Sequence, residues 1–346
     1  MRSVRRVAAC LLGSVILISG LLKLMDPVGT SLIIEEYFKF FGLFSLMTVS
    51  GILGLLIPLF EAVLGAAIIS GGVLPKVTAV AGGITMLFFT AVTAVLWWKN
   101  PAMDCGCFGE AIHLTHKQSF IKNLVLDALW VLAYVPFSSV YRTSRVKLIS
   151  FAAAATGILL FAQWASSAIP PIDFTDLTPG TELFKADDYP SEDAPIIPMC
   201  RPDGTYADFL ATIGHVLTVS VYDPDKVTEK KWERIAGIAR TAEENHYHFY
   251  LLVPYAMELK DSTLTARSFT SDRKVMMTLN RTNGGLTYIN DGFVVRKWAA
   301  RDYPDSEELE AVRREDPTKV MVETTSRTGV LFEGFVLLIL SILLVF

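Results

Sequence analysis

The stretch VTAVAGGITMLFFTAVTAVLWWKNPAMDCGCFGE, Val77–Glu110, decides the class of this protein. Its first part, Val77–Trp98, contains no charged residue and has the length of about 20 residues that a helix needs to cross the hydrocarbon core of a bilayer. It ends in two tryptophans, which suit the aromatic belt at a membrane surface. The sequence therefore places a pair of thiols, Cys105 and Cys107, just outside a predicted membrane span.

The whole chain has the composition of a membrane protein. It contains 346 residues, of which 52% are hydrophobic and 19% are charged, with a mean hydropathy of +0.42. Soluble domains have roughly 45–50% apolar and about 25% charged residues. The apolar residues are concentrated in blocks, and the basic residues do not cluster in the way that nucleic-acid binding requires.

Six apolar runs are predicted to be transmembrane helices. Besides Val77–Trp98 they are Val7–Leu22, Leu43–Val73, Leu124–Val140, Leu148–Ile169 and Val330–Phe346. No small-residue cleavage site follows the first run, so we expect a retained helix rather than a signal peptide. The expected domains are a four-helix membrane domain at 1–140, a fifth span at 141–169, an outer domain at 170–328 and a last span at 329–346.

The basic residues of the short loops predict the orientation. If the spans alternate, one side of the membrane receives Arg2, Arg5, Arg6, Lys76, Arg142, Arg145 and Lys147. The positive-inside rule makes this side the cytoplasm, where both termini would then lie. The cysteine loop and residues 170–328 fall on the other side. In the inner membrane of a bacterial cell that side is the periplasm, where disulfides persist.

Residues 170–328 indicate one α/β domain with a mixed sheet. After a linker rich in proline and aspartate, strands are predicted at 215–223 and 248–255, separated by a helix at 228–245 with Thr228 as its N-cap. A hairpin follows, turning at Asn290-Asp291-Gly292, because such residues tolerate the positive φ that tight hairpin turns need. A terminal helix completes the domain.

The two cysteines favour redox chemistry. A disulfide prefers Cα atoms roughly 5.5 Å apart and a side-chain torsion near 90°, and Gly106 would let the backbone bend enough to close so small a ring. Strained, exposed disulfides tend to be the catalytic or regulatory ones. The alternative is a structural staple, or two thiols in a tight loop. Cys200, in the outer domain, would be either a resolving thiol for the pair or an inert one.

A metal site is a second interpretation of the same loop. Cys105, Cys107, His113 and His116 offer the sulfur and imidazole ligands that zinc prefers, with Asp104 nearby. Their spacing departs from the usual zinc patterns, in which two to four residues separate the cysteines.

Charged residues at membrane depth are candidate functional residues, because they are costly to bury. Glu61 lies in the middle of the second span, shortly after Pro58, and must be protonated or paired. Lys23, at the outer end of the first span, is its candidate partner, and the two could handle protons in a thiol–quinone reaction. The alternative is a structural hydrogen bond between helices. Asp127 is a similar case.

Three segments, SGLLKLMDPVGTSLIIEEYF, IPLFEAVLG and DCGCFGEAIHLTHKQSFIKNLVL, resemble the DoxX/MauE family of four-helix membrane proteins in its Bacteroidetes form, over roughly residues 5–140. The matching positions are Ser19, Gly20, Lys23, Asp26, Pro27, Glu36, Tyr37, Phe38, Pro58, Glu61, Cys105, Gly106, Cys107, Phe108, Gly109, Thr115, Gln118, Lys122 and Asn123. The two histidines of the zinc interpretation are not part of this motif.

The resemblance implies a four-helix bundle akin to the quinone-linked DoxX subunits. For the MauE branch it implies a role in disulfide formation in a periplasmic protein during methylamine utilisation. We therefore predict a catalytic pair with supporting residues around it: Cys105 and Cys107, supported by Gly106, Phe108, Gly109, Lys23, Glu61 and Asp104.

The outer domain is similar to a thioredoxin fold that has lost its thiol chemistry. VLTVSVYD would be the central strand, after which a thioredoxin places Cys-x-x-Cys, but the chain here reads DPDKVTEK. The segment before the hairpin, RTNGGLTYI, lacks the cis-proline of thioredoxins. The resemblance implies a domain that binds a client protein or docks against the cysteine loop.

Two hypotheses of different class follow. In the first, the cysteine pair oxidises the thiols of a periplasmic client protein and passes the electrons to a membrane quinone, with no tightly bound cofactor. In the second, the protein is a non-enzymatic membrane assembly or binding factor whose cysteines form a permanent disulfide. A transporter is disfavoured, because the sequence has no internal repeat.

Overall fold

The computed structural model describes residues 2–135, 144–183 and 194–345. The chain divides into two units. We name Met1–Ser166 together with Phe332–Phe346 the membrane unit, and Ser167–Leu331 the sheet unit. Each unit is described by itself.

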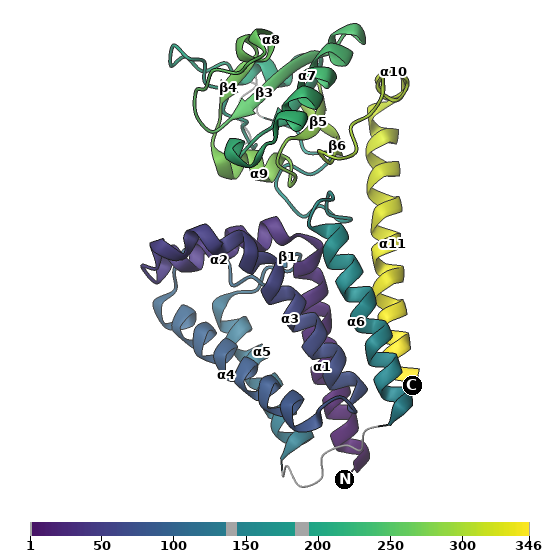
Figure 1. The fold of residues 1–346 in the computed structure, drawn as a ribbon. Helices are drawn as coiled ribbons and strands as arrows, with labels where there is room; N and C mark the ends of the chain where they lie inside the picture. The colour runs from purple at the N-terminus through teal and green to yellow at the C-terminus, as the bar shows by residue number, and fades with distance from the viewer. Residues whose placement is uncertain (1, 136–143, 184–193, 346) are drawn as a thin grey trace. The chain divides into compact units, whose positions relative to one another are not determined.

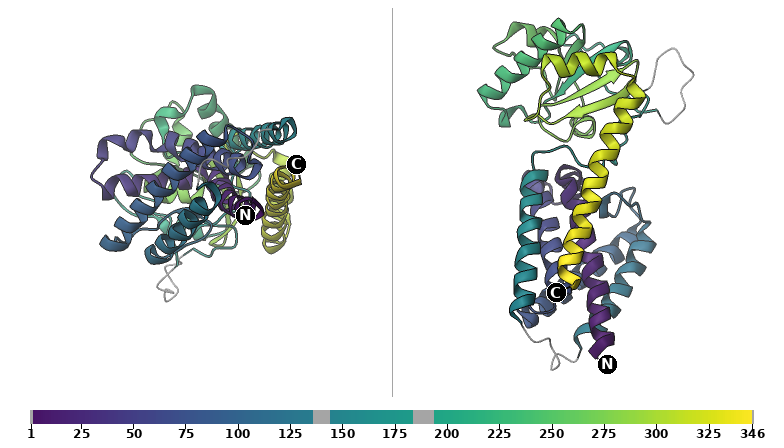
Figure 2. Two further views of the ribbon diagram at one scale, coloured as in Figure 1. Left: turned by 90° about the horizontal axis from the view of Figure 1, so that it is seen from below. Right: turned by 90° about the vertical axis from the view of Figure 1, so that its right-hand side faces the viewer.

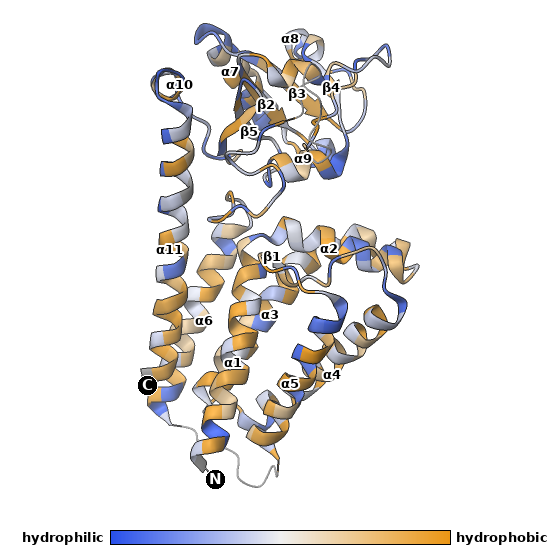
Figure 3. Cartoon of the chain, turned by 180° about the vertical axis from the view of Figure 1, so that it is seen from behind, coloured by the Kyte–Doolittle hydropathy of each residue, from blue (hydrophilic) through white to orange (hydrophobic). Residues whose placement is uncertain are grey.

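The membrane unit is a bundle of helices (Figure 1). In chain order they are α1 (Arg2–Met25), α2 (Pro27–Phe40), the short 3-10 helix η1 (Phe44–Val49), α3 (Ser50–Ser70), α4 (Pro75–Lys99), α5 (His116–Tyr134), α6 (Arg145–Ala165) and the last part of α11 (Pro317–Val345). Among the described residues, five stretches are long and apolar enough to cross a membrane: Ser3–Met25, Phe44–Ser70, Pro75–Lys99, Arg145–Ala165 and Pro317–Leu344. The prediction of a membrane protein is confirmed, and Figure 3 shows the hydrophobic colour along these helices.

The helices of the membrane unit alternate in direction. The start of α1, the turn between α3 and α4 and the start of α6 lie at one end of the unit, whereas the loop between α4 and α5 lies at the other (Figures 1 and 2). The cysteine loop is therefore at the opposite end of the bundle from the N-terminus. We call the end with this loop the loop end.

The fourth predicted span, Leu124–Val140, was wrong in its start. The helix in this region, α5, begins at His116, because Thr115 and Gln118 form a capping box. The N–H of Thr115 donates to Gln118 Oε1 at 2.9 Å, and the N–H of Gln118 donates to Thr115 Oγ1 at 3.3 Å. Helix α5 contains three charged side chains, those of Lys117, Lys122 and Asp127. For this reason α5 is not among the five candidate spans of the described residues. Residues 136–140 of the prediction lie outside the described residues.

Two further helical segments were not predicted. Helix α2 begins where the Asp26 carboxylate accepts a hydrogen bond from the N–H of Gly29 at 2.9 Å, with Pro27 in the first turn, both typical of a helix start. Figure 1 shows that α2 runs across the loop end of the bundle. The last helix, α11, begins at Pro317, well before the predicted span that starts at Val330.

Glycines bring α1 and α3 into close contact. A Cβ atom added at Gly65 would lie 2.4 Å from the backbone nitrogen of Leu17, and one added at Gly20 would lie 2.4 Å from that of Ala62. Small residues let membrane helices approach in this way and gain van der Waals contact along their backbones. The close approach sets the faces of α1 and α3 that carry Lys23 and Glu61 against each other.

The sheet unit contains a five-stranded mixed sheet in the order β4-β3-β2-β5-β6. Its elements are β2 (His215–Ser220), α7 (Glu229–Glu244), β3 (His248–Val253), α8 (Ser262–Ala266), β4 (Ser268–Thr270), α9 (Arg273–Leu279), β5 (Gly285–Asn290), β6 (Phe293–Trp298) and α10 (Ser306–Arg314). Strand β2 pairs in parallel with β3 and antiparallel with β5. The predicted mixed sheet is confirmed.

The predicted hairpin is confirmed. Strands β5 and β6 pair antiparallel, with Asn290 opposite Phe293. The two turn residues between them, Asp291 and Gly292, have positive φ values of 47° and 86°. Two successive residues with positive φ form the kind of turn whose twist matches that of the flanking strands.

Both outer strands of the sheet are covered by segments of the same chain. Beside β4, Cys200 and Thr270 exchange two backbone hydrogen bonds of 2.9 and 2.8 Å. Beside β6, the backbone of residues 180–183 bonds to Gly292 and Val294 at 2.7 to 3.0 Å. These pairings occupy backbone groups that an outer strand would otherwise expose.

We expect Gly65→Ala to destabilise the protein, because the added methyl group would meet the backbone of α1. Overpacking of this kind costs about 1–3 kcal/mol. Thermal unfolding of the detergent-solubilised protein measures the effect. The control is Gly51→Ala on the same helix, where an added Cβ meets nothing within 4 Å. Equal stability of the two variants would contradict the close contact between α1 and α3.

Candidate functional site

The cysteine loop depends on glycine. It runs from the end of α4 into the extended segment β1 (Cys107–Glu110). Gly106 and Gly109 have φ values of +63° and +64°, a conformation that side chains with a Cβ rarely adopt. A Cβ added at Gly106 would also lie 2.6 Å from the Ile33 side chain of α2. The loop is therefore pressed against α2 at a point where only glycine fits.

Two hydroxyl groups hold the backbone of the loop. The Tyr37 hydroxyl donates to the carbonyl of Cys105 at 2.7 Å, and the Ser19 hydroxyl lies 2.7 Å from the carbonyl of Cys107. The same Ser19 hydroxyl is 3.1 Å from a carboxylate oxygen of Glu61. A hydroxyl has only one proton to donate, so Ser19 connects the cysteine loop to Glu61 through a shared donor.

The two thiols lie side by side. Their Sγ atoms are 2.9 Å apart, and both cysteines are free. Cys105 is 6% exposed and Cys107 is half-buried. A disulfide bond is about 2.05 Å long, so only a small displacement separates the two sulfurs from bonding distance. The geometry suits a pair that alternates between dithiol and disulfide.

The surroundings distinguish the two thiols, which lie in the loop outside the candidate spans. The hydrogen bond with Cys105 lowers the pKa of Cys107 to about 5, and the charges of Lys122 and Lys23 act in the same direction against the opposing effect of burial. The hydrogen bond with Cys107 raises the pKa of Cys105, and burial raises it further. At neutral pH the pair therefore holds one proton, with Cys107 as the thiolate, the form of cysteine that attacks as a nucleophile.

Lys23 and Glu61 form a buried ion pair. The Lys23 ammonium lies 2.7 and 2.6 Å from the two carboxylate oxygens of Glu61. The residues are 7% and 1% exposed. Each charge satisfies the other, as a buried charge requires. The prediction that Lys23 is the partner of Glu61 is confirmed.

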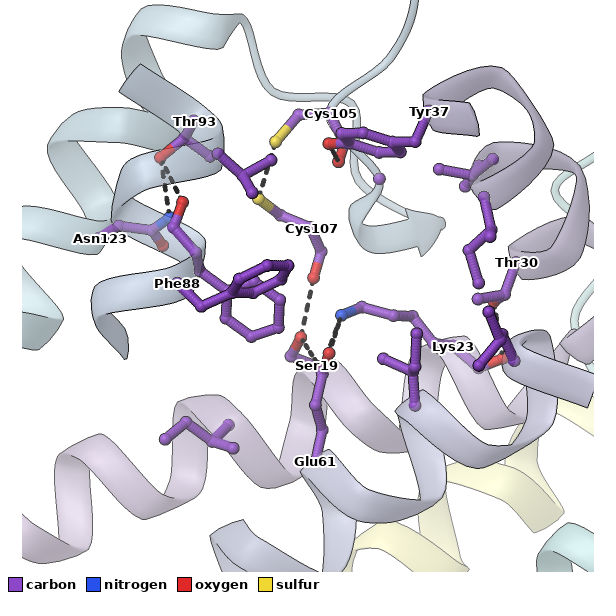
Figure 4. Close-up of a pocket in the computed structure, with 18 of the residues that line it drawn as sticks. Ser19, Lys23, Thr30, Tyr37, Glu61, Phe88, Thr93, Cys105, Cys107 and Asn123 are labelled. Carbon is purple, nitrogen blue, oxygen red and sulfur yellow. Dashed lines mark hydrogen bonds and ion pairs between the residues drawn. The ribbon is translucent and has the colours of Figure 1, made fainter. Parts of the chain in front are cut away.

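The pair and the thiols share one cavity of about 420 Å³ (Figure 4). This volume is in the range of about 300–1,000 Å³ that small-molecule sites occupy. Most of the lining side chains are apolar and come from α1 to α5. The polar lining residues are Ser19, Lys23, Thr30, Tyr37, Glu61, Thr93, Cys105, Cys107, Lys122 and Asn123. A mostly apolar cavity with a few polar groups suits a lipophilic ligand that carries a polar ring.

The structure brings most of the predicted site residues together. Gly106 lines the cavity with both cysteines, and Gly109 lies beside Lys23, with its missing Cβ 3.5 Å from the lysine side chain. Phe108 lies beneath Lys122, whose ammonium is 4.8 Å from the centre of the ring. Asp104 does not line the cavity: it is exposed and contacts His113 at 3.1 Å.

The alternative ligands of the cysteine loop lie apart from the two sulfurs. His113 pairs with Asp104, and His116 Nε2 is 3.0 Å from the carbonyl of Pro101. Within the described ranges, no three His, Cys, Asp or Glu residues are grouped so that they could hold a metal ion. Asp127 accepts a hydrogen bond from Thr90 at 2.7 Å. Cys200, in the sheet unit, is half-buried beside β4.

Sequence reasoning missed six polar residues of the cavity. Thr30 and Thr93 were not singled out, and four others were noted as family positions but not as site residues: Ser19, Tyr37, Lys122 and Asn123. Tyr37 was missed because α2, which carries it, was not predicted. Lys122 lies on the first turns of α5, ahead of the predicted span, so its approach to the loop was not visible. The pattern Thr115-x-x-Gln118 is a capping box, and it could have indicated that the helix begins early enough to include Lys122.

In the sheet unit, the loop after β2 is bonded to the loop before β5. The Asn283 side chain accepts from the N–H of Asp223 at 3.1 Å and donates to the carbonyl of Asp223 at 2.7 Å. The Tyr222 hydroxyl donates to the carbonyl of Arg281 at 3.0 Å. These are the two segments in which the thioredoxin resemblance would place Cys-x-x-Cys and the cis-proline. In this protein the two segments are hydrogen-bonded to each other.

Comparison with known proteins identifies the N-terminal part of the chain. Residues 1–136 match the family model described as methylamine utilisation protein MauE. Over these residues the chain is similar to the MauE family, as predicted from the three quoted segments, and the match includes the cavity and the cysteine loop. No curated protein and no solved structure matches the chain.

We expect Lys122→Gln to raise the pKa of the Cys107 thiol, because the variant removes a positive charge that stabilises the thiolate. The midpoint of the pH dependence of alkylation should move up by roughly 1 pH unit or more. The measurement uses the reduced protein with Cys10 and Cys200 replaced by serine. Lys117→Gln, at an exposed position of the same helix, is the control. An unchanged midpoint in Lys122→Gln would show that Lys122 does not act on the thiolate.

Proposed function

We propose that this MauE-like membrane protein is a thiol–disulfide oxidoreductase that oxidises the thiols of a client protein and reduces a membrane quinone. Cys105 and Cys107 are the redox pair. The observation that carries the proposal is their position: two thiols 2.9 Å apart form part of the wall of a mainly apolar cavity, which also contains a buried ion pair.

The oxidation of the client proceeds by two exchanges. A client thiolate attacks the Cys105 sulfur of the disulfide, and Cys107 leaves as a thiolate, because the thiol of lower pKa is the better leaving group. The second client thiol, as thiolate, then attacks the client sulfur of the mixed disulfide and releases Cys105. The client gains a disulfide, and the pair becomes a dithiol.

The pair is then oxidised again by the quinone. Formation of the Cys105–Cys107 bond from the Cys105 thiol and the Cys107 thiolate releases two electrons and one proton. The quinone becomes a quinol by taking up both electrons, this proton and one further proton from water. The proposed quinone ring lies near Lys23 and Glu61, where the lysine donates a hydrogen bond or a proton to a ring oxygen. Ser19, within reach of Cys107 and Glu61, links the thiol side of the cavity to the ion pair.

The proposed orientation places the cysteine loop and residues 170–328 in the periplasm, and both termini in the cytoplasm, in a bacterial inner membrane. The supporting observation is that Arg5, Arg6, Lys76, Arg145 and Lys147 belong to segments at the end of the membrane unit opposite the cysteine loop. Basic residues favour the cytoplasmic side. The periplasm is also the compartment where a client disulfide would persist.

The sheet unit is proposed to be a thioredoxin-like domain that holds the client without exchanging thiols itself. Its support is the order β2-α7-β3, then α8, β4 and α9, then the β5–β6 hairpin and α10, together with the sequence DPDKVTEK, which contains no cysteine after β2. In this segment the Asn283 side chain bonds to both backbone groups of Asp223.

The alternative, a permanent staple in a non-enzymatic assembly factor, has less support. Tyr37 and Ser19 already hold the backbone carbonyls of both cysteines, and the loop packs on Ile33 through Gly106. A loop fixed in this way does not need a disulfide to keep its shape.

We expect the reduced, purified protein to reduce a short-tailed benzoquinone under anaerobic conditions, forming one quinol for each disulfide. Quinone absorbance and thiol titration measure the two products. Cys105→Ser and Cys107→Ser should both abolish the reaction at unchanged protein level. A pair that remains reduced with excess quinone, or variants whose function declines only with protein level, would refute the redox proposal.

Glu61→Gln should slow quinone reduction by about tenfold or more, because the variant removes a proton-handling group and leaves the Lys23 charge unpaired. Stopped-flow absorbance measures the rate, and alkylation of Cys107 reports whether the loop is intact. The matched control is Asp127→Asn, an acidic residue of the same unit that bonds to Thr90 and does not line the cavity. Equal rates in the two variants would remove Glu61 from the mechanism.

A further inference from the structure

The cavity of the membrane unit is open to the outside. Four of its lining residues are also exposed large apolar side chains: Phe41 at 45%, Leu43 at 44%, Ile57 at 37% and Phe88 at 61%. Because these side chains both line the cavity and reach the surface, they mark its mouth. All four of these side chains are apolar.

Two of the four residues at the mouth, Ile57 and Phe88, lie within candidate membrane spans, whereas Phe41 and Leu43 precede the span that begins at Phe44. Ile57 belongs to the candidate span Phe44–Ser70, and Phe88 lies in the middle of the candidate span Pro75–Lys99. On α3, the lining positions Leu53, Ile57 and Glu61 are one helical turn apart and form one face, which runs from the mouth to the ion pair. The adjacent Leu56 is 50% exposed and does not line the cavity. The part of the mouth formed by Ile57 of α3 and Phe88 of α4 therefore faces the depth at which lipid surrounds these helices.

The two ends of the cavity differ in chemistry. The inner end carries the hydroxyls of Ser19 and Tyr37, the Lys23–Glu61 pair and the two thiols. At the outer end, all four side chains that form the mouth are apolar. A ligand that satisfies both ends has a polar head and an apolar tail. The apolar side chains of the mouth offer water no hydrogen bonds. An alkyl or isoprenoid chain, in contrast, can pass between them into the bilayer without leaving an apolar environment.

We infer that the substrate is a lipid-tailed quinone that enters sideways from the bilayer, with its ring at the ion pair and the thiols and its tail leaving past Ile57 and Phe88. The inference rests on the proposed function and adds to it the route of entry and the residues that line this route. Ile57 and Phe88 are then residues that determine specificity for the tail, and they take no part in the redox chemistry.

The experiment compares two benzoquinones with the same substituted ring, one with a ten-carbon tail and one without a tail. The kcat/KM ratio of tailed to tail-less quinone is measured in the same detergent for the wild type, Ile57→Trp and Leu56→Trp. We expect Ile57→Trp to lower this ratio by about tenfold, because the larger side chain obstructs the exit of the tail. Leu56→Trp, on the neighbouring exposed face of α3, should keep the wild-type ratio.

A second measurement needs no variant. A quinone whose tail carries a photoreactive group should label peptides of α3 and α4 that contain Ile57 and Phe88, and excess unlabelled tailed quinone should suppress this labelling. An unchanged ratio in Ile57→Trp, or labelling elsewhere in the protein, would overturn the route of entry while quinone reduction itself stands. If the wild type reduces neither quinone, the proposed function fails and the inference fails with it.

Discussion

The ion pair between Lys23 and Glu61 is the constraint on which the rest of the membrane unit depends. Two charges at 1% and 7% exposure can remain in a membrane bundle only if each lies within hydrogen-bond distance of the other. That distance requires α1 and α3 to touch, which the glycines at positions 20 and 65 allow. Replacing a buried pair with apolar residues is often neutral or stabilising, so the stability of the bundle does not by itself explain the pair. Its position in the wall of a cavity does.

The same pair organises the cysteine loop. Ser19, one turn before Lys23 on α1, reaches both Glu61 and the carbonyl of Cys107. On the other side of the loop, Tyr37 of α2 holds Cys105. The loop is therefore held by α1 and α2 as well as by the helices α4 and α5 that it connects. The hydrogen bond between the two thiols lowers the pKa of Cys107 and raises that of Cys105, and the charges of Lys122 and Lys23 lower the pKa of Cys107 further. A single arrangement of side chains thus fixes the place of the two sulfurs and separates their pKa values.

Much of this could be predicted from the sequence, and the rest has physical reasons for escaping it. Apolar runs such as Val77–Trp98 are strong signals because a bilayer demands length and hydrophobicity together. The Asn290-Asp291-Gly292 hairpin was predicted because its turn chemistry is local. Helix α2 escaped prediction because it is short and its signal is a cap, the Asp26 side chain, rather than a periodic pattern. The cavity escaped prediction because it is formed by five helices, and no single segment of the chain carries its pattern. Asp104 was predicted from its place beside Cys105, but neighbouring residues of a tight loop point in different directions, and its carboxylate turns to His113.

The covered strands of the sheet unit have a consequence for how a partner can be recognised. An extended peptide often binds a protein by adding itself as a new strand to an open sheet edge, where the backbone supplies most of the affinity. Beside β4 that position is taken by Cys200, and beside β6 by residues 180–183. At these positions an added strand would find the backbone groups already paired, so the sheets of neighbouring copies would gain little from meeting edge to edge there.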